Sequence, residues 1–268
     1  MIYRLLAIDL DGTLLTRNKR ILPRTRSALD AAAARGCRVV IATGRGFAVA
    51  RYFCDGLTLS APQITYNGAV IHDPSQGRDL CQYLVPPAYV KPGVDFFREA
   101  GVPAALFTPQ TLYLDRRIPH PRAWLPNGTG VLELIPDVRS VAAQPCIKVV
   151  GHSDPLTIAA LRPLAVERFG HALYVTQTSP QLLELLHPEV SKGAALRRIA
   201  HMLGVARDEV IAFGDSHNDL DMLEFAGVGV AMGNASAEVK ALADLITDSN
   251  EDDGIATALE RLGVIGVI

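Results

Sequence analysis

Apolar and polar positions in the N-terminal third of the chain predict alternating strands and helices. The apolar runs around Leu6 and Val40 are continuous, which is typical of strands buried on both faces of a parallel sheet. Pro23 begins a helical pattern and Gly36 follows its end, as expected for the two ends of a helix. We therefore expect strands at 4–9, 37–42 and 63–66, and helices at 23–35 and 46–53.

The C-terminal third repeats this alternation. Ser191 is placed to cap a helix whose apolar residues follow helical spacing until Gly204 ends it. We expect strands at 209–213, 228–231 and 245–247, and helices at 192–203, 218–224 and 236–243. Strands that alternate with helices in this way predict an α/β fold with a doubly wound parallel sheet, Rossmann-like in architecture.

The middle of the chain has a different sequence pattern, with many prolines and short alternating runs. Ten prolines interrupt it from Pro86 to Pro145, and short alternating runs at 104–108, 111–114 and 146–150 are typical of antiparallel strands. These features predict an α+β domain inserted into the sheet domain. The expected division is a core domain at 1–83 and 189–268, and an inserted cap domain at 84–188.

Composition narrows the class of protein. The 26 Lys and Arg residues against 28 Asp and Glu give a net charge of −2, without the basic surface of a nucleic-acid binder. An apolar share of 49% indicates a folded chain, and no stretch offers the roughly 20 apolar residues of a membrane span. The four cysteines are widely spaced without a CxxC pair, so we expect reduced thiols and a cytoplasmic location. The first residues lack the longer apolar core of a signal peptide, so we expect no export signal.

The segment from Asp9 to Thr13, Asp-Leu-Asp-Gly-Thr, is the first candidate for chemistry. Asp11-Gly12 by itself is typical of a turn between two apolar runs. That interpretation leaves Asp9 unexplained, because an unpaired carboxylate at the end of a buried strand is costly. A bound cation or phosphoryl chemistry would account for it.

A second candidate, Thr43-Gly44-Arg45, follows the second strand. Gly44 with Gly46 and Val49 also fits a degraded dinucleotide-binding pattern, but that pattern belongs after the first strand and lacks its third glycine here. The alternative is a strand-to-helix turn whose amides and Thr43 hydroxyl bind a phosphate.

The densest cluster of polar residues is Gly214-Asp-Ser-His-Asn-Asp-Leu-Asp221. One acid or amide would suffice to cap a helix, whereas four suggest oxygen ligands for a hard cation such as Mg²⁺. The order of residues excludes an EF-hand, and the histidines lack the spacing of a zinc site. Lys192 is either a solvated lysine or, at the start of a helix where a cation is disfavoured, a partner for a shared anion.

These candidates share one position, since Asp9, Thr43 and Asp215 each lie at or just after the end of a predicted strand. Ligands of open α/β sheets bind at that edge. The order DLDGT, ATGR, SKG and GDSHND resembles the four motifs of the haloacid dehalogenase (HAD) superfamily. The spacing is similar to its Cof-type phosphatases, which carry a large α/β cap, and Tyr66-Asn-Gly-Ala69 resembles a further segment of that group.

The resemblance implies a role for each matched residue. Asp9 would be the nucleophile that accepts the phosphoryl group, and Asp11 the general acid and base. Asp11 would then need a pKa raised relative to that of Asp9. Mg²⁺ would be held by Asp9, the backbone carbonyl of Asp11 and Asp215, with Asp219 orienting that shell. The phosphate would be bound by Thr43, Gly44, Arg45, Lys192 and Asn218.

The resemblance also implies a reaction, the hydrolysis of a small phosphorylated metabolite such as a sugar phosphate. A phosphosugar mutase or phosphotransferase could use the same two aspartates, and a non-catalytic phosphometabolite-binding protein is a further alternative. Substrate selection would fall to the cap, where His120, Arg122 and Trp124 are possible contacts, although surface loops commonly carry such residues. Oligomeric state cannot be derived from the sequence.

Overall fold

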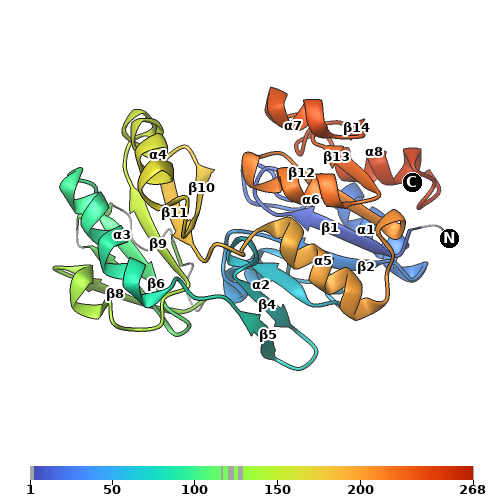
Figure 1. The fold of residues 1–268 in the computed structure, drawn as a ribbon. Coiled ribbons are helices and arrows are strands. Elements are labelled where there is room, and N and C mark those ends of the chain that lie inside the picture. Colours follow the sequence, from blue (N-terminus) through green and yellow to red (C-terminus); the bar gives the residue numbers. More distant parts are fainter. Residues whose placement is uncertain (1–2, 116, 120–123, 126–128, 268) are drawn as a thin grey trace. The chain divides into compact units, whose positions relative to one another are not determined.

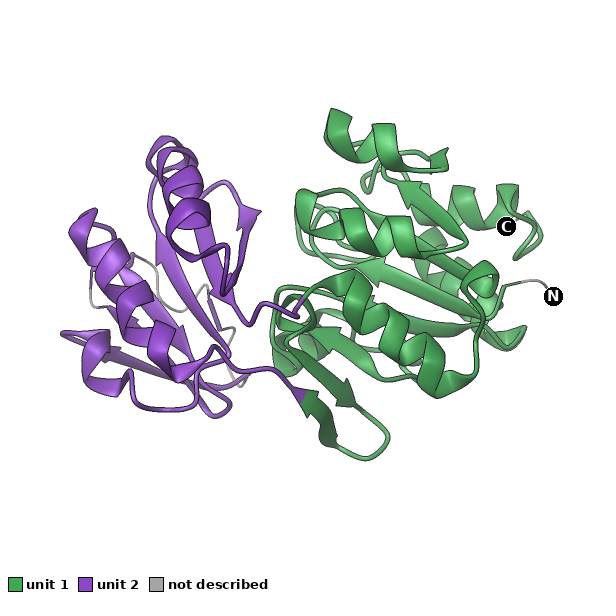
Figure 2. Cartoon of the chain, in the orientation of Figure 1, with its two compact units in different colours: residues 1–81, 191–268 green, residues 82–190 purple. Residues whose placement is uncertain are grey.

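The computed structural model describes residues 3–115, 117–119, 124–125 and 129–267, which form two compact units (Figure 2). Unit 1 comprises Met1–Cys81 and Ser191–Ile268, and unit 2 comprises Gln82–Val190. The chain thus leaves unit 1 two residues before the expected boundary and returns to it two residues after, with unit 2 inserted between the two halves.

The described part of unit 1 is built on an eight-stranded sheet with the order β14-β13-β12-β1-β2-β3-β4-β5 (Figure 1). The pairs from β14 to β3 are parallel, and β4 runs antiparallel to β3. The strands are β1 (Leu5–Asp9), β2 (Arg38–Ala42), β3 (Gln63–Thr65), β4 (Val70–Asp73), β5 (Arg78–Gln82), β12 (Val210–Gly214), β13 (Val228–Ala231) and β14 (Leu245–Ile246).

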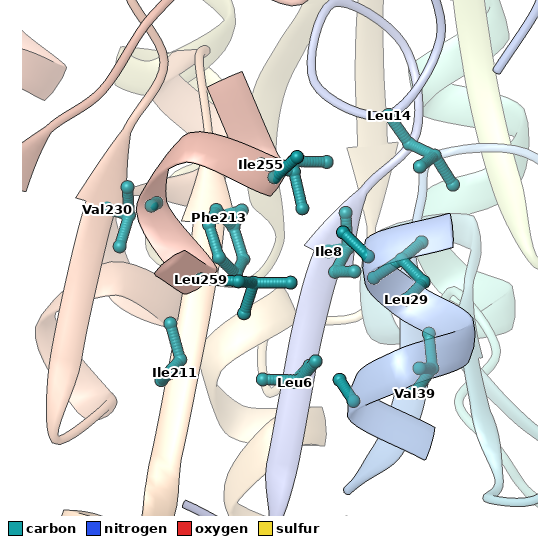
Figure 3. Packing of buried hydrophobic residues seen from close by; sticks show 14 of the residues in the cluster. Leu6, Ile8, Leu14, Leu29, Val39, Ile211, Phe213, Val230, Ile255 and Leu259 are labelled. Atoms are coloured by element: carbon teal, nitrogen blue, oxygen red, sulfur yellow. The ribbon is translucent and has the colours of Figure 1, made fainter. Parts of the chain in front are cut away.

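Helices cover both faces of this sheet. They are α1 (Pro23–Ala34), α2 (Phe47–Phe53), α5 (Lys192–Leu203), α6 (Leu220–Phe225), α7 (Ala237–Leu242) and α8 (Gly254–Arg261). Because side chains alternate along a strand, Leu6 and Ile8 of β1 pack with α1 and α8 (Figure 3), whereas Leu5 and Ala7 pack with α5, α6 and α7. The doubly wound sheet is therefore confirmed.

Unit 2 contains a second sheet with the order β10-β11-β9-β6-β7-β8, antiparallel except where β7 meets β8. Its elements are α3 (Pro87–Glu99), β6 (Ala104–Phe107), β7 (Thr111–Asp115), β8 (Val131–Ile135), β9 (Lys148–His152), α4 (Pro155–Phe169), β10 (Tyr174–Ser179) and β11 (Leu182–Leu186). Phe97 of α3 and Ile158 of α4 pack on one face of the sheet. The inserted α+β architecture is thus also confirmed.

The sequence patterns left several elements unpredicted, among them the neighbouring strands β4 and β5 and the helices α3 and α4. Both helices begin with a proline and contain another, Pro92 in α3 and Pro163 in α4, and Pro92 is one of the ten prolines that interrupt the hydrophobic pattern. No helix within the described ranges has the length and apolar character that a membrane span requires.

Candidate active site

The predicted site residues of unit 1 come together at the carboxyl edge of its parallel sheet. Asp9 is the last residue of β1 and is paired in register with Ala42, which precedes Thr43 on the neighbouring strand. Asp215 directly follows β12, the strand on the other side of β1. Parallel strands bring their carboxyl ends to the same edge, so residues more than 200 positions apart meet there.

Lys192 is the first residue of α5, and its ammonium group connects two carboxylates. Its Nζ donates to Oδ1 of Asp9 at 2.6 Å and to Oδ1 of Asp219 at 2.6 Å. All three side chains are almost fully buried. Burial opposes the charge on the lysine, but the two carboxylates outweigh it and raise the pKa of Lys192. The shared carboxylates explain why a cation is stable at a helix N-terminus.

Asp219 organises the groups around it. Its Oδ1 accepts from Lys192, and its Oδ2 accepts from the backbone amides of Asp215 at 3.1 Å and Ser216 at 3.0 Å. Both oxygens of Asp219 are thereby engaged. This carboxylate is consequently suited to holding the lysine and the loop after β12 in place.

Asp215 is a partly exposed carboxylate held by two hydroxyls. Thr13 Oγ1 donates to its Oδ1 at 3.0 Å, and Ser216 Oγ donates to its Oδ2 at 3.2 Å. Burial and the neighbouring charge of Asp219 raise the pKa of Asp215 to about 6. Gly12 lies against this group: a Cβ at position 12 would stand 2.5 Å from Oδ2 of Asp215.

One carboxylate oxygen from each of Asp9, Asp215 and Asp219 lies within 4.8 Å of the other two. When all three carboxylates are ionised, they exceed the one ammonium, that of Lys192, by two negative charges. Burial raises the pKa of Asp9 well above its ordinary value, and the charges of Asp219 and Asp215 add to this despite Lys192. Hard oxygen donors with this charge fit a divalent cation such as Mg²⁺, and Asp9 and Asp215 are the residues that would hold it.

Asp11 occupies a different environment from Asp9. Arg45 donates to its two oxygens from Nε at 2.5 Å and from Nη2 at 2.8 Å, and Lys19 Nζ donates at 2.6 Å. Burial would raise the pKa of Asp11, but these two cations outweigh burial and lower it. In this structure the pKa of Asp9 is the raised one, since Asp9 is the more deeply buried and lies among other carboxylates. The raised pKa of Asp11 that the first step of the reaction requires stays a prediction.

The loop after β2 holds three of the predicted phosphate-binding residues, Thr43, Gly44 and Arg45. Thr43 is buried, and its Oγ1 accepts from the backbone amide of Arg45 at 3.1 Å. Gly44 lies between them and is half-buried. The guanidinium of Arg45 lies 5.1 Å from the centre of the Phe53 ring while it binds Asp11. In this structure Arg45 therefore contacts the second aspartate directly.

Asn218 is buried in the turn His217–Asp219, and its Nδ2 donates to Oδ1 of Asn67 at 3.0 Å. Among the residues that contact the site without a role assigned from the sequence are Thr13, Lys19 and Asn67. Thr13 is the last residue of the DLDGT segment and Asn67 belongs to the Tyr66–Ala69 segment, so a signal existed for both. No sequence signal pointed to Lys19, because its side chain meets Asp11 only when the chain between them is folded.

Comparison with known proteins agrees with this geometry. A profile described as haloacid dehalogenase-like hydrolase matches residues 6–259. The chain belongs to this family.

The chain is 32% identical over 266 residues to the 5-amino-6-(5-phospho-D-ribitylamino)uracil phosphatase YitU of Bacillus subtilis (strain 168), with 96% of each chain covered. A solved haloacid dehalogenase-like hydrolase from Bacteroides thetaiotaomicron superposes with a TM-score of 0.83 at 28% identity, covering 97% of this chain and 99% of the other. A solved HAD subclass IIB sugar phosphatase superposes with the same TM-score at 25% identity, covering 98% and 100%. The expectations of a Cof-type member and of a phosphatase are thus confirmed.

Proposed function

We propose that this haloacid dehalogenase-like hydrolase is a Mg²⁺-dependent phosphatase that cleaves a small phosphorylated metabolite through a phosphoaspartyl intermediate on Asp9. The observation that carries the proposal is the position of Asp9: a carboxylate at the end of a buried strand, 2.6 Å from the buried Lys192 ammonium and beside two further carboxylates. Lys192 holds only Oδ1, and Oδ2 makes no hydrogen bond to the described residues. An oxygen of Asp9 is thus available to attack phosphorus.

The reaction has two displacements. A carboxylate oxygen of Asp9 forms a bond to phosphorus as the bond to the leaving oxygen breaks, and Asp11 gives that oxygen a proton. Water then attacks the phosphorus of the acyl phosphate and gives its proton to Asp11, which releases inorganic phosphate and restores Asp9. Asp11 can serve in this way once its carboxyl group separates from Arg45 and Lys19, which now hold both of its oxygens.

The negative charge of the transferring group requires positive partners. We assign this role to Lys192, the amide of Gly44 and the hydroxyl of Thr43, which lie at the sheet edge, and to the Asn218 amide as a further donor. Arg45 can exchange its contact with Asp11 for one with the ester, which would free the acid at the moment the substrate arrives. Mg²⁺, when bound, would neutralise further charge on the phosphoryl oxygens.

The names of two relatives support a substrate class for the proposal. The Bacillus subtilis relative is named for a ribitylaminouracil phosphate, and the subclass IIB structure is named a sugar phosphatase. Both names describe phosphate esters of polyhydroxylated carbon chains. We assign this chain a substrate of the same kind, selected by unit 2. Of the three selection candidates there, Trp124 is half-buried beside Phe107 and His152, whereas His120 and Arg122 lie outside the described residues.

The experiment is phosphate release from sugar phosphates, polyol phosphates, nucleotides, flavin mononucleotide and para-nitrophenyl phosphate, with MgCl₂ or with chelator. We expect release with MgCl₂ only, and none above background from Asp9→Asn, since the intermediate cannot form without the carboxylate. A sugar acceptor added to the assay separates hydrolysis from transfer. Asp9→Asn with more than a few per cent of wild-type rate, after correction for deamidation, would contradict the proposal.

A further inference from the structure

The turn Tyr66–Gly68 after β3 contacts the loop Thr43–Arg45, which carries three of the predicted phosphate-binding residues. The backbone amide of Tyr66 donates to the carbonyl of Arg45 at 3.0 Å, and that of Asn67 donates to the carbonyl of Thr43 at 2.9 Å. These two hydrogen bonds join the turn to both ends of the segment Thr43–Arg45. The position of this segment is thus set from outside by the turn.

The same turn approaches the start of α5. Gly68 has a φ of +100°, and a Cβ at that position would stand 2.3 Å from the carbonyl oxygen of Ser191, the residue before Lys192. A glycine is therefore required for the backbone of the turn to lie this close to the helix N-terminus. One short turn consequently touches two chain segments that contribute to the site.

Asn67 provides the third contact. Its side chain is fully buried, and its Oδ1 accepts from Nδ2 of Asn218 at 3.0 Å. Its backbone is left-handed, with φ 58° and ψ 25°, a conformation that asparagine tolerates better than most residues. The buried Oδ1 of Asn218 has no hydrogen-bond partner within the described part of the chain.

With Oδ1 of Asn67 directed at Asn218, the pairing favours one orientation of the Asn218 amide. An amide group can turn over and exchange its donor for its acceptor, and only the nitrogen can give a hydrogen bond to Oδ1 of Asn67. With the nitrogen directed to Asn67, its second hydrogen remains for an anion oxygen, and Oδ1 remains for a donor that enters with the ligand. A buried acceptor without a partner is costly, so this orientation needs support from Asn67.

We propose that Asn67 is a positioning residue for phosphoryl binding, because its side chain orients the Asn218 amide. The turn to which it belongs also fixes the positions of Thr43 and of Lys192 relative to Asn218. The inference rests on the proposed function, because it assigns Asn67 to the same phosphate site. It predicts that Asn67 and Asn218 act as one unit, so that removing the second adds little once the first is gone.

The test compares Asn67→Gly, Asn218→Ala and the double variant. Glycine retains the left-handed backbone at position 67 and removes only the amide side chain. The readouts are the dissociation constant of inorganic phosphate by calorimetry with MgCl₂, and kcat and KM for para-nitrophenyl phosphate. We expect each single variant to weaken phosphate binding about tenfold, and the double variant to match Asn218→Ala.

Gln63→Ala provides the control for lost stability. Gln63 is a buried amide in the same sheet, and among the residues that the structure describes its side chain bonds only to the backbone of Val39, Ile41 and Ala61. It should lower the Tm and leave the phosphate dissociation constant unchanged. Single effects that multiply to about a hundredfold, or wild-type phosphate binding by Asn67→Gly, would overturn the inference.

The calorimetric readout keeps the two proposals separate. A wild-type protein that binds phosphate with this pattern of variants but cleaves no ester would support the role of Asn67 and contradict the phosphatase mechanism. A wild-type protein that binds no phosphate would overturn both. Cleavage lost in Asp9→Asn together with independent effects at 67 and 218 would overturn the positioning role alone.

Discussion

At the residue scale, a side chain at position 12 would collide with the Asp215 carboxylate, and glycine avoids this collision. Its φ is +89°, and a Cβ would stand 2.5 Å from Oδ2 of Asp215. The absent side chain thus leaves room for a carboxylate that we assign to Mg²⁺. Backbone strain and steric exclusion contribute separately here, and a second glycine allows them to be measured apart.

We expect Gly12→Ala to lose most phosphatase activity and Mg²⁺ binding, because the new methyl group must displace the Asp215 carboxylate. Gly77→Ala is the matched control: its φ is +63°, and a Cβ there would meet nothing within 4 Å. The control should lose about 1 kcal/mol of stability from the left-handed backbone and retain full activity. Equal activity in the two variants, assayed with matched folded fractions, would contradict the role of Gly12.

The thiols differ in their expected reactivity. Burial raises the pKa of Cys54 and of Cys146 to about 12, so at pH 8 only about one in 10⁴ of these groups is the reactive thiolate. Cys81 is half-buried, whereas the other three thiols are buried. A disulfide reagent at pH 8 should modify Cys81 first in the folded protein and all four thiols in denaturant, as mass spectrometry would show. Early modification of Cys146 would contradict this order.

The same thiols define a pH dependence of stability. The unfolded thiols ionise near 9.0 and the folded ones near 12, so the unfolded state loses protons first as the pH rises. Cys54 and Cys146 should therefore contribute their stability below pH 9 and lose it progressively between pH 9 and 12. Replacing both with alanine should flatten the decline in urea-unfolding free energy over this range.

At the element scale, α5 places the functional lysine. Ser191 caps this helix, its Oγ accepting from the backbone amide of Ala194 at 3.1 Å. Lys192 is the next residue, so its backbone position depends on where the helix begins. The expected helix from 192 to 203, its serine cap and Gly204 at its end all agree with the structure, because these signals lie within one short segment of sequence.

We expect Ser191→Ala to cost about 1 kcal/mol and to lower kcat severalfold, since loss of the cap loosens the helix turn that holds Lys192. Ser236→Ala is the matched control, because Ser236 caps α7 in the same way through Val239. It should cost a similar free energy and leave kcat unchanged. Urea unfolding and steady-state kinetics provide the two measurements, and parallel kcat losses in both variants would contradict a specific role for the α5 cap.

The unpredicted helices α3 and α4 show the limit of local signals. Pro87 and Pro155 stand in their first turns, where the missing amide is harmless, but Pro92 and Pro163 lie within them. An internal proline usually ends a helix, so the sequence favours a break. Packing of Phe97, Ile158 and Leu161 against the sheet of unit 2 offsets that cost in the folded protein.

At the scale of the whole molecule, each unit has an apolar core of its own. Phe97 is fully buried in the core of unit 2, and Phe213 is fully buried in that of unit 1. Separate cores favour separate units of cooperative unfolding. The chain connects the units twice, at 81–82 and 190–191.

We expect Phe97→Ala to cost about 3–5 kcal/mol and to reduce amide hydrogen-exchange protection mainly in unit 2. Phe213→Ala should cost a similar amount and reduce protection mainly in unit 1. Exchange measured by mass spectrometry on both variants tests this pattern. Loss of protection in both units from either substitution would indicate a single cooperative molecule.

The sequence by itself determined the parts of this protein whose signals are local or ordered along the chain. These are the parallel sheet, the insertion in its middle, the family, and the residue types from Asp9 to Asp221 that phosphoryl chemistry needs. The hydrophobic pattern indicates such features directly, because strands and helices each place apolar side chains at a characteristic spacing along the chain.

Only the tertiary structure decided which acidic side chain pairs with which basic one. Lys192 lies between Asp9 and Asp219, whereas Arg45 and Lys19 hold Asp11, so the two aspartates of one motif acquire opposite pKa shifts. These pairings join residues as much as 183 positions apart. They depend on which strands are neighbours and on how deeply each group is buried, because electrostatic interactions follow distance and solvation in space.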